Sequence, residues 1–337
     1  MQIFHNPNYN FVRWRWHAIA LSWVVIIAGL VTIYTRGLPL GVEFSGGTIV
    51  IVKFDKTPPD SGVIRAALDT SMAGVGANSV INRYGDPALN QVMIRVPNVG
   101  AEAGGELSRT GDAVVHAVNQ AGLGPINGSC TATNSANCVA GTDIVGPIVG
   151  KQLTRQGTLA TVLALGGILL YVAFRFQFSF AVGAVVATIH DLLVTFAVLA
   201  FFRYDLSLNV IAAILTITGY SVNDTIVIFD RVRENLRGMR RDNISQIVNV
   251  AVNQTLGRTI LTAGTTLISV LALFFFGGEV LHGFAFTMLV GVVTGTYSSV
   301  FIAAAIVIIW QGRRPMKGQT AAASAASAPK PKRRRAS

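Results

Sequence analysis

The stretch LNVIAAILTITGYSVNDTIVIFDRVREN, residues 208–235, joins a long apolar run to a charged segment. The run from Leu208 to Phe229 is long enough to cross about 30 Å of hydrocarbon, which takes roughly 20 helical residues. Asn223 and Asp224 nevertheless fall inside it. A charged side chain at the centre of a membrane helix costs roughly 2.5–3.5 kcal/mol on insertion scales, and such residues are usually functional. The stretch therefore predicts a membrane helix that carries a functional carboxylate.

The rest of the 337-residue chain is typical of a membrane protein with one inserted soluble domain. Hydrophobic residues make up 51% of it and charged residues 13%, about half of the charge of a soluble globular domain. The deficit is localised, because residues 34–156 have an ordinary soluble composition and residues 159–310 are mostly apolar. The predicted fold class is a polytopic α-helical membrane protein.

Six apolar stretches have the length of a membrane span. They cover residues 17–34, 159–174, 180–202, 208–229, 258–276 and 284–310. The second is short unless its helix begins near Lys151. No small-x-small cleavage site follows the first, which is interpreted as a retained signal anchor. The expected organisation is an N-terminal arm (1–16), helix 1 (17–34), a soluble domain (35–150), helices 2–6 (151–310) with a loop at 231–257, and a disordered basic tail (311–337).

The basic residues predict the orientation of these spans. The formal net charge is +11, yet residues 35–156 hold nine basic and nine acidic side chains. The excess lies in the arm, the turn at Arg175, the 231–257 loop and the tail, which share one side of a six-span topology. Because Lys and Arg mark cytoplasmic segments, both termini are expected in the cytoplasm and the soluble domain is expected to be exported. Topology thus explains the charge without nucleic acid as a partner.

The soluble domain has the pattern of a small α+β sandwich. Strands are predicted at 48–54, 79–84, 91–96 and within 139–145, with a helix beginning at Asp60 or Ser61 and a second one ending at Gly122. The order β-α-β-β-α-β predicts a ferredoxin-like domain between helices 1 and 2. Its sequence holds no His/carboxylate constellation for catalysis, so an interaction role, not an enzymatic one, is expected.

Two cysteines lie in the Gly/Ser/Asn/Thr-rich segment 127–141 of this domain. Cys130 and Cys138 are eight residues apart. On the exported side, where the environment is oxidising, a disulfide would close this loop. The alternative is two incidental thiols in a variable loop. No His or further Cys lies near them in sequence, and a zinc site is not expected.

One other segment resembles a cofactor motif and fails the test. Gly146–Lys151 is one residue too short for a phosphate loop, and Gln152 stands where Ser or Thr would bind magnesium. Zinc-protease and nucleophile-elbow motifs are absent from the sequence. No metal or cofactor is therefore expected.

The ionisable residues within the spans predict the site. Asp224 lies about 9 Å on the cytoplasmic side of the centre of its span, and Arg258 begins the next, antiparallel span. The two helices can therefore meet. A neighbouring guanidinium favours a charged carboxylate and desolvation favours the neutral acid, so conformation could change the protonation of Asp224. A proton relay of Asp224 and Arg258 is the main hypothesis, and a static salt bridge is the alternative.

Polar stripes on several spans predict an internal hydrophilic path around this pair. They recur at helical spacing, and the sixth span adds a small-residue face with Gly291-x-x-x-Gly295, suited to close packing. A packing role is an equally weighted alternative for Asp191. The supporting polar residues are His190, Asp191, Ser221, Asn223, Thr262, Thr265 and Thr266.

Several of these motifs resemble a known family. GYSVNDTIVIFDRVREN (219–235), GRTILTAGTT (257–266), GVEFSGGT (41–48), VGPIVGKQL (145–153) and the His190-Asp191 pair are similar to those of the SecF family, part of the bacterial SecD–SecF complex and the RND superfamily. The resemblance covers residues 11–310. Glu43 stands where the family usually has Asp, and the Cys130–Cys138 loop and the tail match no family pattern.

The resemblance implies a function that spacing alone does not. Such proteins reside in the inner membrane, pair with SecD around the Sec channel (SecY, SecE, SecG and accessory subunits) and use the proton-motive force to promote translocation of unfolded polypeptides. Asp224 and Arg258 match the family's membrane carboxylate and its paired arginine. A proton-coupled small-molecule exporter of the same superfamily and a non-transporting translocon scaffold are the competing hypotheses.

Overall fold

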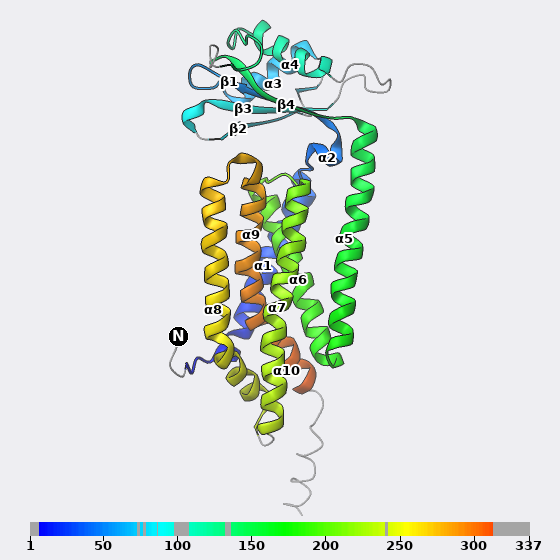
Figure 1. Ribbon diagram of the computed structural model, residues 1–337, viewed down its shortest axis with the longest axis vertical. Coiled ribbons are helices and arrows are strands. Elements are labelled where there is room, and N and C mark those ends of the chain that lie inside the picture. Colours follow the sequence, from blue (N-terminus) through cyan, green and yellow to red (C-terminus); the bar gives the residue numbers. More distant parts are fainter. Residues whose placement is uncertain are drawn as a thin grey trace, which may run out of the picture.

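The computed structural model describes residues 7–72, 75–76, 79–85, 87–97, 108–131, 136–239 and 242–312. Over these residues the chain forms a bundle of long helices with a small sheet domain at one end (Figure 1). The predicted tail from residue 313 on and the first six residues of the arm lie outside them.

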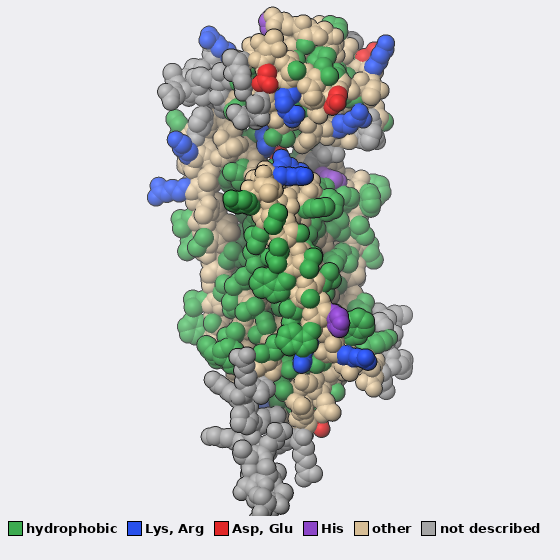
Figure 2. Space-filling model, turned by 180° about the vertical axis from the view of Figure 1, so that it is seen from behind, with side chains coloured by type: hydrophobic (Ala, Val, Ile, Leu, Met, Phe, Trp, Pro, Cys, Tyr) green, Lys and Arg blue, Asp and Glu red, His purple; other side chains and the backbone are tan. Residues whose placement is uncertain are grey.

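Six helical segments are long and apolar enough to cross a membrane within the described part of the chain. Figure 2 shows hydrophobic side chains covering the bundle, with Lys and Arg side chains toward its two ends. The helices are α1 (Arg15–Arg36), preceded by the 3₁₀ turn η1 (Phe11–Trp14), α5 (Pro147–Arg175), α6 (Phe178–Phe202), α7 (Leu208–Gly238), α8 (Ile244–Phe276) and α9 (Glu279–Ser298), which continues through a π-helical turn (Ser299–Ala303) into α10 (Ala304–Gly312).

Helix α5 begins well before the apolar stretch at 159–174. Its first residue is Pro147, whose fixed φ and missing N–H suit the first position of a helix. The second span therefore begins before Lys151, as the length of the membrane requires.

The segment 231–257, expected to be a loop, is mostly helical. Helix α7 continues to Gly238, and α8 begins at Ile244 with Asn243 and Gln246 forming a capping box. The first turns of α8 bury an apolar stripe that includes Ile247, Val248 and Ala251. The expectation was wrong because charged and polar residues on the outward face lower the mean hydropathy without breaking the helix.

Small residues set the spacing of the helices. A Cβ added to Gly291 on α9 would lie 2.3 Å from Ile217 Cδ1 on α7, and one added to Gly295 would lie 2.9 Å from Ser221 Cβ. The small-residue face predicted for close packing is thereby confirmed. On α1, the buried residues Ala18, Ser22, Ile26 and Gly29 form one stripe, which packs against α6.

The sheet domain has the predicted β-α-β-β-α-β order. It consists of β1 (Gly47–Lys53), α3 (Ser61–Ser71), β2 (Val80–Tyr84), β3 (Gln91–Val96), α4 (Ser108–Gln120) and β4 (Cys138–Val145), with a one-turn helix α2 (Val42–Ser45) before β1. The strands pair antiparallel in the order β2-β3-β1-β4. In Figure 1, α3 and α4 cover the sheet face away from the bundle. This is the ferredoxin-like arrangement.

Alternate strand residues explain the core of this domain. Val50 and Val52 of β1 are fully buried with Ile94 of β3, Leu68 of α3 and Val114 of α4, as the period of two in a half-buried strand requires. Cys130 and Cys138 form the disulfide that the spacing suggested. It ties the segment before β4 to the first residue of that strand.

Candidate functional site within the helix bundle

Asp224 lies on α7 with its carboxyl group turned toward α8. Its Oδ1 accepts a hydrogen bond from the Thr259 hydroxyl at 2.7 Å. Its Oδ2 is shielded from solvent and has no hydrogen-bond partner among the described residues. An unsatisfied buried acceptor costs about 1–3 kcal/mol, and more if charged. This oxygen is therefore a place where a proton or a water molecule would bind.

The structure does not join Asp224 to Arg258 in an ion pair. Helices α7 and α8 do pack together, as their antiparallel order predicts. However, Arg258 is exposed, and within the described part of the chain no carboxylate lies within ion-pair distance of it. Its neighbour Thr259 is buried and makes the contact with Asp224. The relay role of the two residues stays a prediction.

The polar stripe on α8 faces outward in the isolated chain. Thr262 and Thr265 are exposed and Thr266 is half-buried. Each hydroxyl bonds to a carbonyl oxygen of its own helix at 2.9–3.0 Å. Asn223 on α7 is also exposed. Polar side chains in membrane spans usually face protein or water, so we expect another protein surface to cover this face.

Asp191 on α6 is the centre of a second, fully buried polar cluster. Its Oδ1 lies 3.0 Å from His190 Nδ1, and its Oδ2 accepts hydrogen bonds from the hydroxyls of Ser298, at 2.8 Å, and Ser221. Three helices thus converge on one carboxylate. His190 Nε2 is buried without a hydrogen-bond partner among the described residues, and its ring stacks on Tyr297 at 6.4 Å between centroids.

Hydroxyl groups bridge the space between the two carboxylates. Ser221 is one helical turn before Asp224, an axial rise of about 4.5 Å. Thr225, next to Asp224, shares a 2.9 Å hydrogen bond with Ser299, which follows Ser298 on the neighbouring helix. Ser299 also begins the π-helical turn, and π-turns are frequent at functional sites.

The sequence identifies four members of this cluster, Asp224, Asp191, His190 and Ser221, and misses five others, Thr225, Thr259, Tyr297, Ser298 and Ser299. Thr259 was passed over because the stripe was counted from Arg258, one position away. Ser298 is a small residue that follows the Gly291-x-x-x-Gly295 face at helical spacing, so the sequence indicates packing and not a hydrogen bond to Asp191. Ser299 and Tyr297 gave no signal of their own, because their role depends on which face of α9 meets α6 and α7.

An ion pair links the sheet domain to the bundle. Arg95 of β3 lies 2.9 Å from Asp205, in the turn between α6 and α7, and also donates to the carbonyl of Leu40 at 2.6 Å. The backbone continues this contact, since Leu206 N–H donates to Pro39 and Gly41 N–H donates to Leu206, both at 2.8 Å. Burial raises the pKa of Asp205 above its usual 3.8; Arg95 and Arg203 oppose the rise and Glu43 adds to it.

This contact is expected to tighten as the pH falls. Burial favours protonated Asp205, so the docked arrangement binds a proton that the undocked one releases near pH 3.8. The stabilisation of the docked arrangement is fully present below pH 3.8 and is lost as the pH rises through the raised pKa of Asp205. Amide hydrogen exchange at Gly41 and Leu206 is measured over a range of pH in the wild type and in Asp205→Asn. The protection of these amides in the wild type, relative to their protection in the variant at the same pH, should fall as the pH rises. Protection that instead rises with pH would mean that Arg95 outweighs burial.

Comparison with known proteins identifies the family. Residues 127–313 match the family described as "Protein export membrane protein SecD/SecF, C-terminal", and residues 31–58 match the "SecD/SecF GG Motif". The chain is 37% identical to the protein translocase subunit SecF of Koribacter versatilis, covering 95% of this chain and 96% of that one. With the SecF of Pseudomonas aeruginosa it shares 41% identity over 89% and 90% of the two chains. The chain belongs to the SecF family of protein translocase subunits.

Solved structures agree with this assignment. SecDF from Thermus thermophilus, a translocon-associated membrane protein, superposes with a TM-score of 0.75 at 32% identity. The match covers 91% of this SecF-family chain and 39% of the SecDF chain. A second SecDF structure, in a super-membrane-facing form, gives a TM-score of 0.64 at 31% identity, with 95% and 41% covered. The chain therefore spans about two fifths of the length of these SecDF chains.

Proposed function

We propose that this chain is the SecF half of a SecD–SecF unit that uses the proton-motive force to promote translocation of unfolded polypeptides through the Sec channel, formed by SecY, SecE and SecG. Membership of the SecF family supports Sec protein export. The fused SecDF relatives, which this chain covers by about two fifths, support SecD as the partner. In this proposal the chain lies in the inner membrane with both termini in the cytoplasm and the sheet domain in the periplasm.

The observation that carries the proton coupling is the unsatisfied Oδ2 of Asp224. A carboxylate that accepts from the Thr259 hydroxyl in a solvent-shielded position changes its hydrogen bonding whenever it gains or loses a proton. Movement of α7 against α8 would alter access to this oxygen, which is the behaviour required of a proton carrier. No resident cofactor enters the proposal.

The available energy is sufficient for such a switch. One proton that moves inward through 100 mV gains about 2.3 kcal/mol. A two-state helix arrangement is shifted by more than tenfold by this amount. The shift could be transmitted to the sheet domain through the contact between Arg95 and Asp205, because Asp205 lies in the turn that leads directly into α7.

The outward polar face of α8 supports SecD as the partner. Arg258, Thr262 and Thr265 are exposed on a helix that is long and apolar enough to span the membrane. A second helical bundle that covers this face would remove the cost of placing these groups against lipid. The second bundle would also surround Arg258 with polar groups, on the exposed face of α8.

Inverted membrane vesicles test the proposal. Vesicles that contain the Sec channel, SecD and this chain are expected to import a precursor protein faster when a proton gradient is present, and an ionophore should remove that increment. Vesicles depleted of this chain should lack the increment from the start. Gradient-independent stimulation would indicate a scaffold, and failure to co-purify with SecD or the channel would favour a small-molecule exporter.

A further inference from the structure

The N-terminal arm is fastened to α8 by two asparagines. Asn249 accepts a hydrogen bond from Phe11 N–H at 2.9 Å and donates to the Tyr9 carbonyl at 3.0 Å. Asn253 accepts from Tyr9 N–H at 2.9 Å and donates to the same carbonyl at 2.8 Å. These side chains satisfy backbone groups of Tyr9 and of Phe11, the first residue of η1, so residues 9–12 have a defined position on the bundle.

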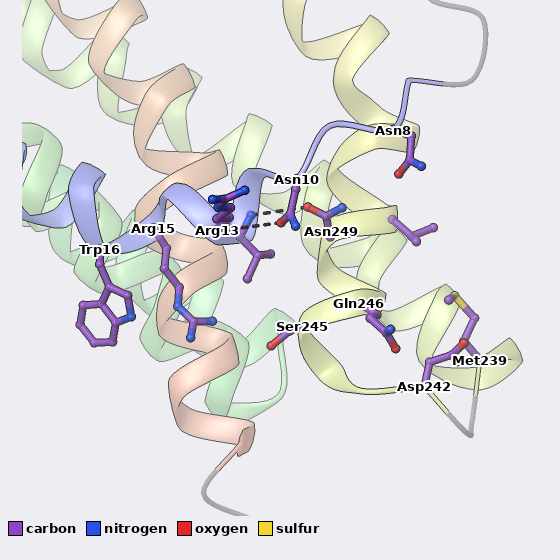
Figure 3. A pocket seen from close by; sticks show the side chains of 12 residues that line it. Asn8, Asn10, Arg13, Arg15, Trp16, Met239, Asp242, Ser245, Gln246 and Asn249 are labelled. Atoms are coloured by element: carbon purple, nitrogen blue, oxygen red, sulfur yellow. Dashed lines mark hydrogen bonds between the residues drawn. The ribbon is translucent and has the colours of Figure 1, made fainter.

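A polar cavity of about 680 Å³ lies on one side of this arm, at the bundle end opposite the sheet domain. Its walls come from the arm, the start of α1 and the first turns of α8. In Figure 3, Arg15 extends from α1 toward Ser245, while Arg13, Asn10 and Asn249 lie together. The lining residues are Asn8, Asn10, Val12, Arg13, Arg15, Trp16, Met239, Asp242, Ser245, Gln246, Asn249 and Val250.

The charge of this cavity favours an anion. Arg13 and Arg15 contribute two cations, neither of them in an ion pair within the described part of the chain, against the single carboxylate of Asp242. Ser245 and Gln246 lie in the first turn of α8, a 33-residue helix, whose dipole adds positive potential at that end. Arg side chains and amide groups are the donors that bind phosphate oxygens in proteins.

An apolar groove of about 550 Å³ adjoins the polar cavity. Its walls include Trp14, Leu256, Ile260 and Phe301, and Asn10 lines both spaces. Trp14 and Trp16 are 63% and 59% exposed, as tryptophans of the headgroup region are. A basic polar cavity beside an apolar groove at that depth has the two halves of a phospholipid-binding site.

We propose that this paired site binds one anionic phospholipid, with its phosphate between Arg13 and Arg15 and an acyl chain along Trp14 and Ile260. Basic pockets between membrane helices at the cytoplasmic surface bind anionic lipid headgroups in this way. A soluble phosphate would satisfy the arginines but leave the groove empty. The groove is therefore what assigns the site to a lipid.

Native mass spectrometry of the purified full chain tests the assignment. Protein in detergent is titrated with dioleoylphosphatidylglycerol or dioleoylphosphatidylcholine. The wild type should retain one phosphatidylglycerol with clear preference over phosphatidylcholine. Replacing Arg13 and Arg15 together by Gln should weaken its binding about thirtyfold, because each basic group near an anionic surface contributes about fivefold. Arg233→Gln, a cation of the same end of the bundle outside the cavity, should leave the binding unchanged.

Two further variants keep the test decisive if the double variant does not fold. Gln246→Glu preserves the capping box and places a negative charge in the cavity. It should therefore weaken the binding of phosphatidylglycerol but not the binding of phosphatidylcholine. Ile260→Asn should weaken the binding of both lipids. Ile268 lies on the same helix, is 70% exposed and is outside the groove, so Ile268→Asn should leave the binding of both lipids unchanged. Equal binding of the two lipids by the wild type, unchanged binding by Gln246→Glu, or displacement of the lipid by millimolar inorganic phosphate would overturn the proposal.

Discussion

Replacing Asp224 by asparagine is expected to abolish the proton-gradient-dependent increment of protein export. The amide keeps the volume of the side chain and an oxygen that can accept from Thr259, so the chain should still fold, insert and bind SecD. It cannot gain or lose a proton at physiological pH. The increment measured in inverted vesicles should therefore fall to the level seen after ionophore treatment, while gradient-independent export continues.

Asp230→Asn is the matched control for this variant. Asp230 lies on the same helix, almost two turns later, and is exposed; among the described residues its ion pair is a long one, 3.9 Å to Arg175. Its replacement should change the increment by less than twofold, since exposed pairs contribute little. Full gradient dependence in the Asp224→Asn protein would refute the carrier role and leave Asp224 as a packing residue.

The second large effect is expected from Gly29→Val on α1. A Cβ at this position would lie 2.0 Å from Ala197 Cβ and 2.4 Å from Ala197 Cα on α6. The nearest atoms are backbone and a methyl group, neither of which can rotate away, so the helices must separate. Overpacking typically costs about 1–3 kcal/mol, and contact with backbone puts this change at the upper end of that range. Thermal unfolding in detergent should show a clear loss of stability, together with increased proteolysis of the arm.

Ala28→Val controls for the change in side chain. Ala28 is the preceding residue and is exposed on the outer face of α1, so the same β-branched group points away from α6 there. Its melting temperature should stay within a few degrees of the wild type. If the two variants were equally stable, α1 would not depend on close contact with α6.

Much of the fold is encoded in local patterns. Apolar stretches of span length predict membrane helices because lipid leaves the backbone no other partner, and all six are present. In the sheet domain, β-branched alternation and the Asp60 N-cap predict the strands and the first helix with small errors at the ends. The 231–257 segment shows the limit of the method, since hydropathy cannot distinguish a solvated helix face from a loop.

The candidate site divides along the same line. The sequence alone indicates that Asp224 and Asp191 cost free energy in the membrane, because a carboxylate in an apolar helix is unfavourable wherever that helix packs. It could not show what each would contact. Rotation of α8 by one position puts Thr259, not Arg258, on Asp224, and convergence of three helices puts Ser221 and Ser298 on Asp191.

The sequence by itself thus determined that the chain spans a membrane six times, carries an α+β domain after the first span and places carboxylates within its spans. Only the tertiary structure decided which hydroxyls satisfy those carboxylates, that Oδ2 of Asp224 has no hydrogen-bond partner among the described residues, and that Arg258 faces outward. The physical reason is that hydropathy and strand alternation depend on each residue's own chemistry. A hydrogen bond between helices depends on their relative rotation, which is fixed only when the helices pack, as where Gly291 and Gly295 of α9 lie against Ile217 and Ser221 of α7.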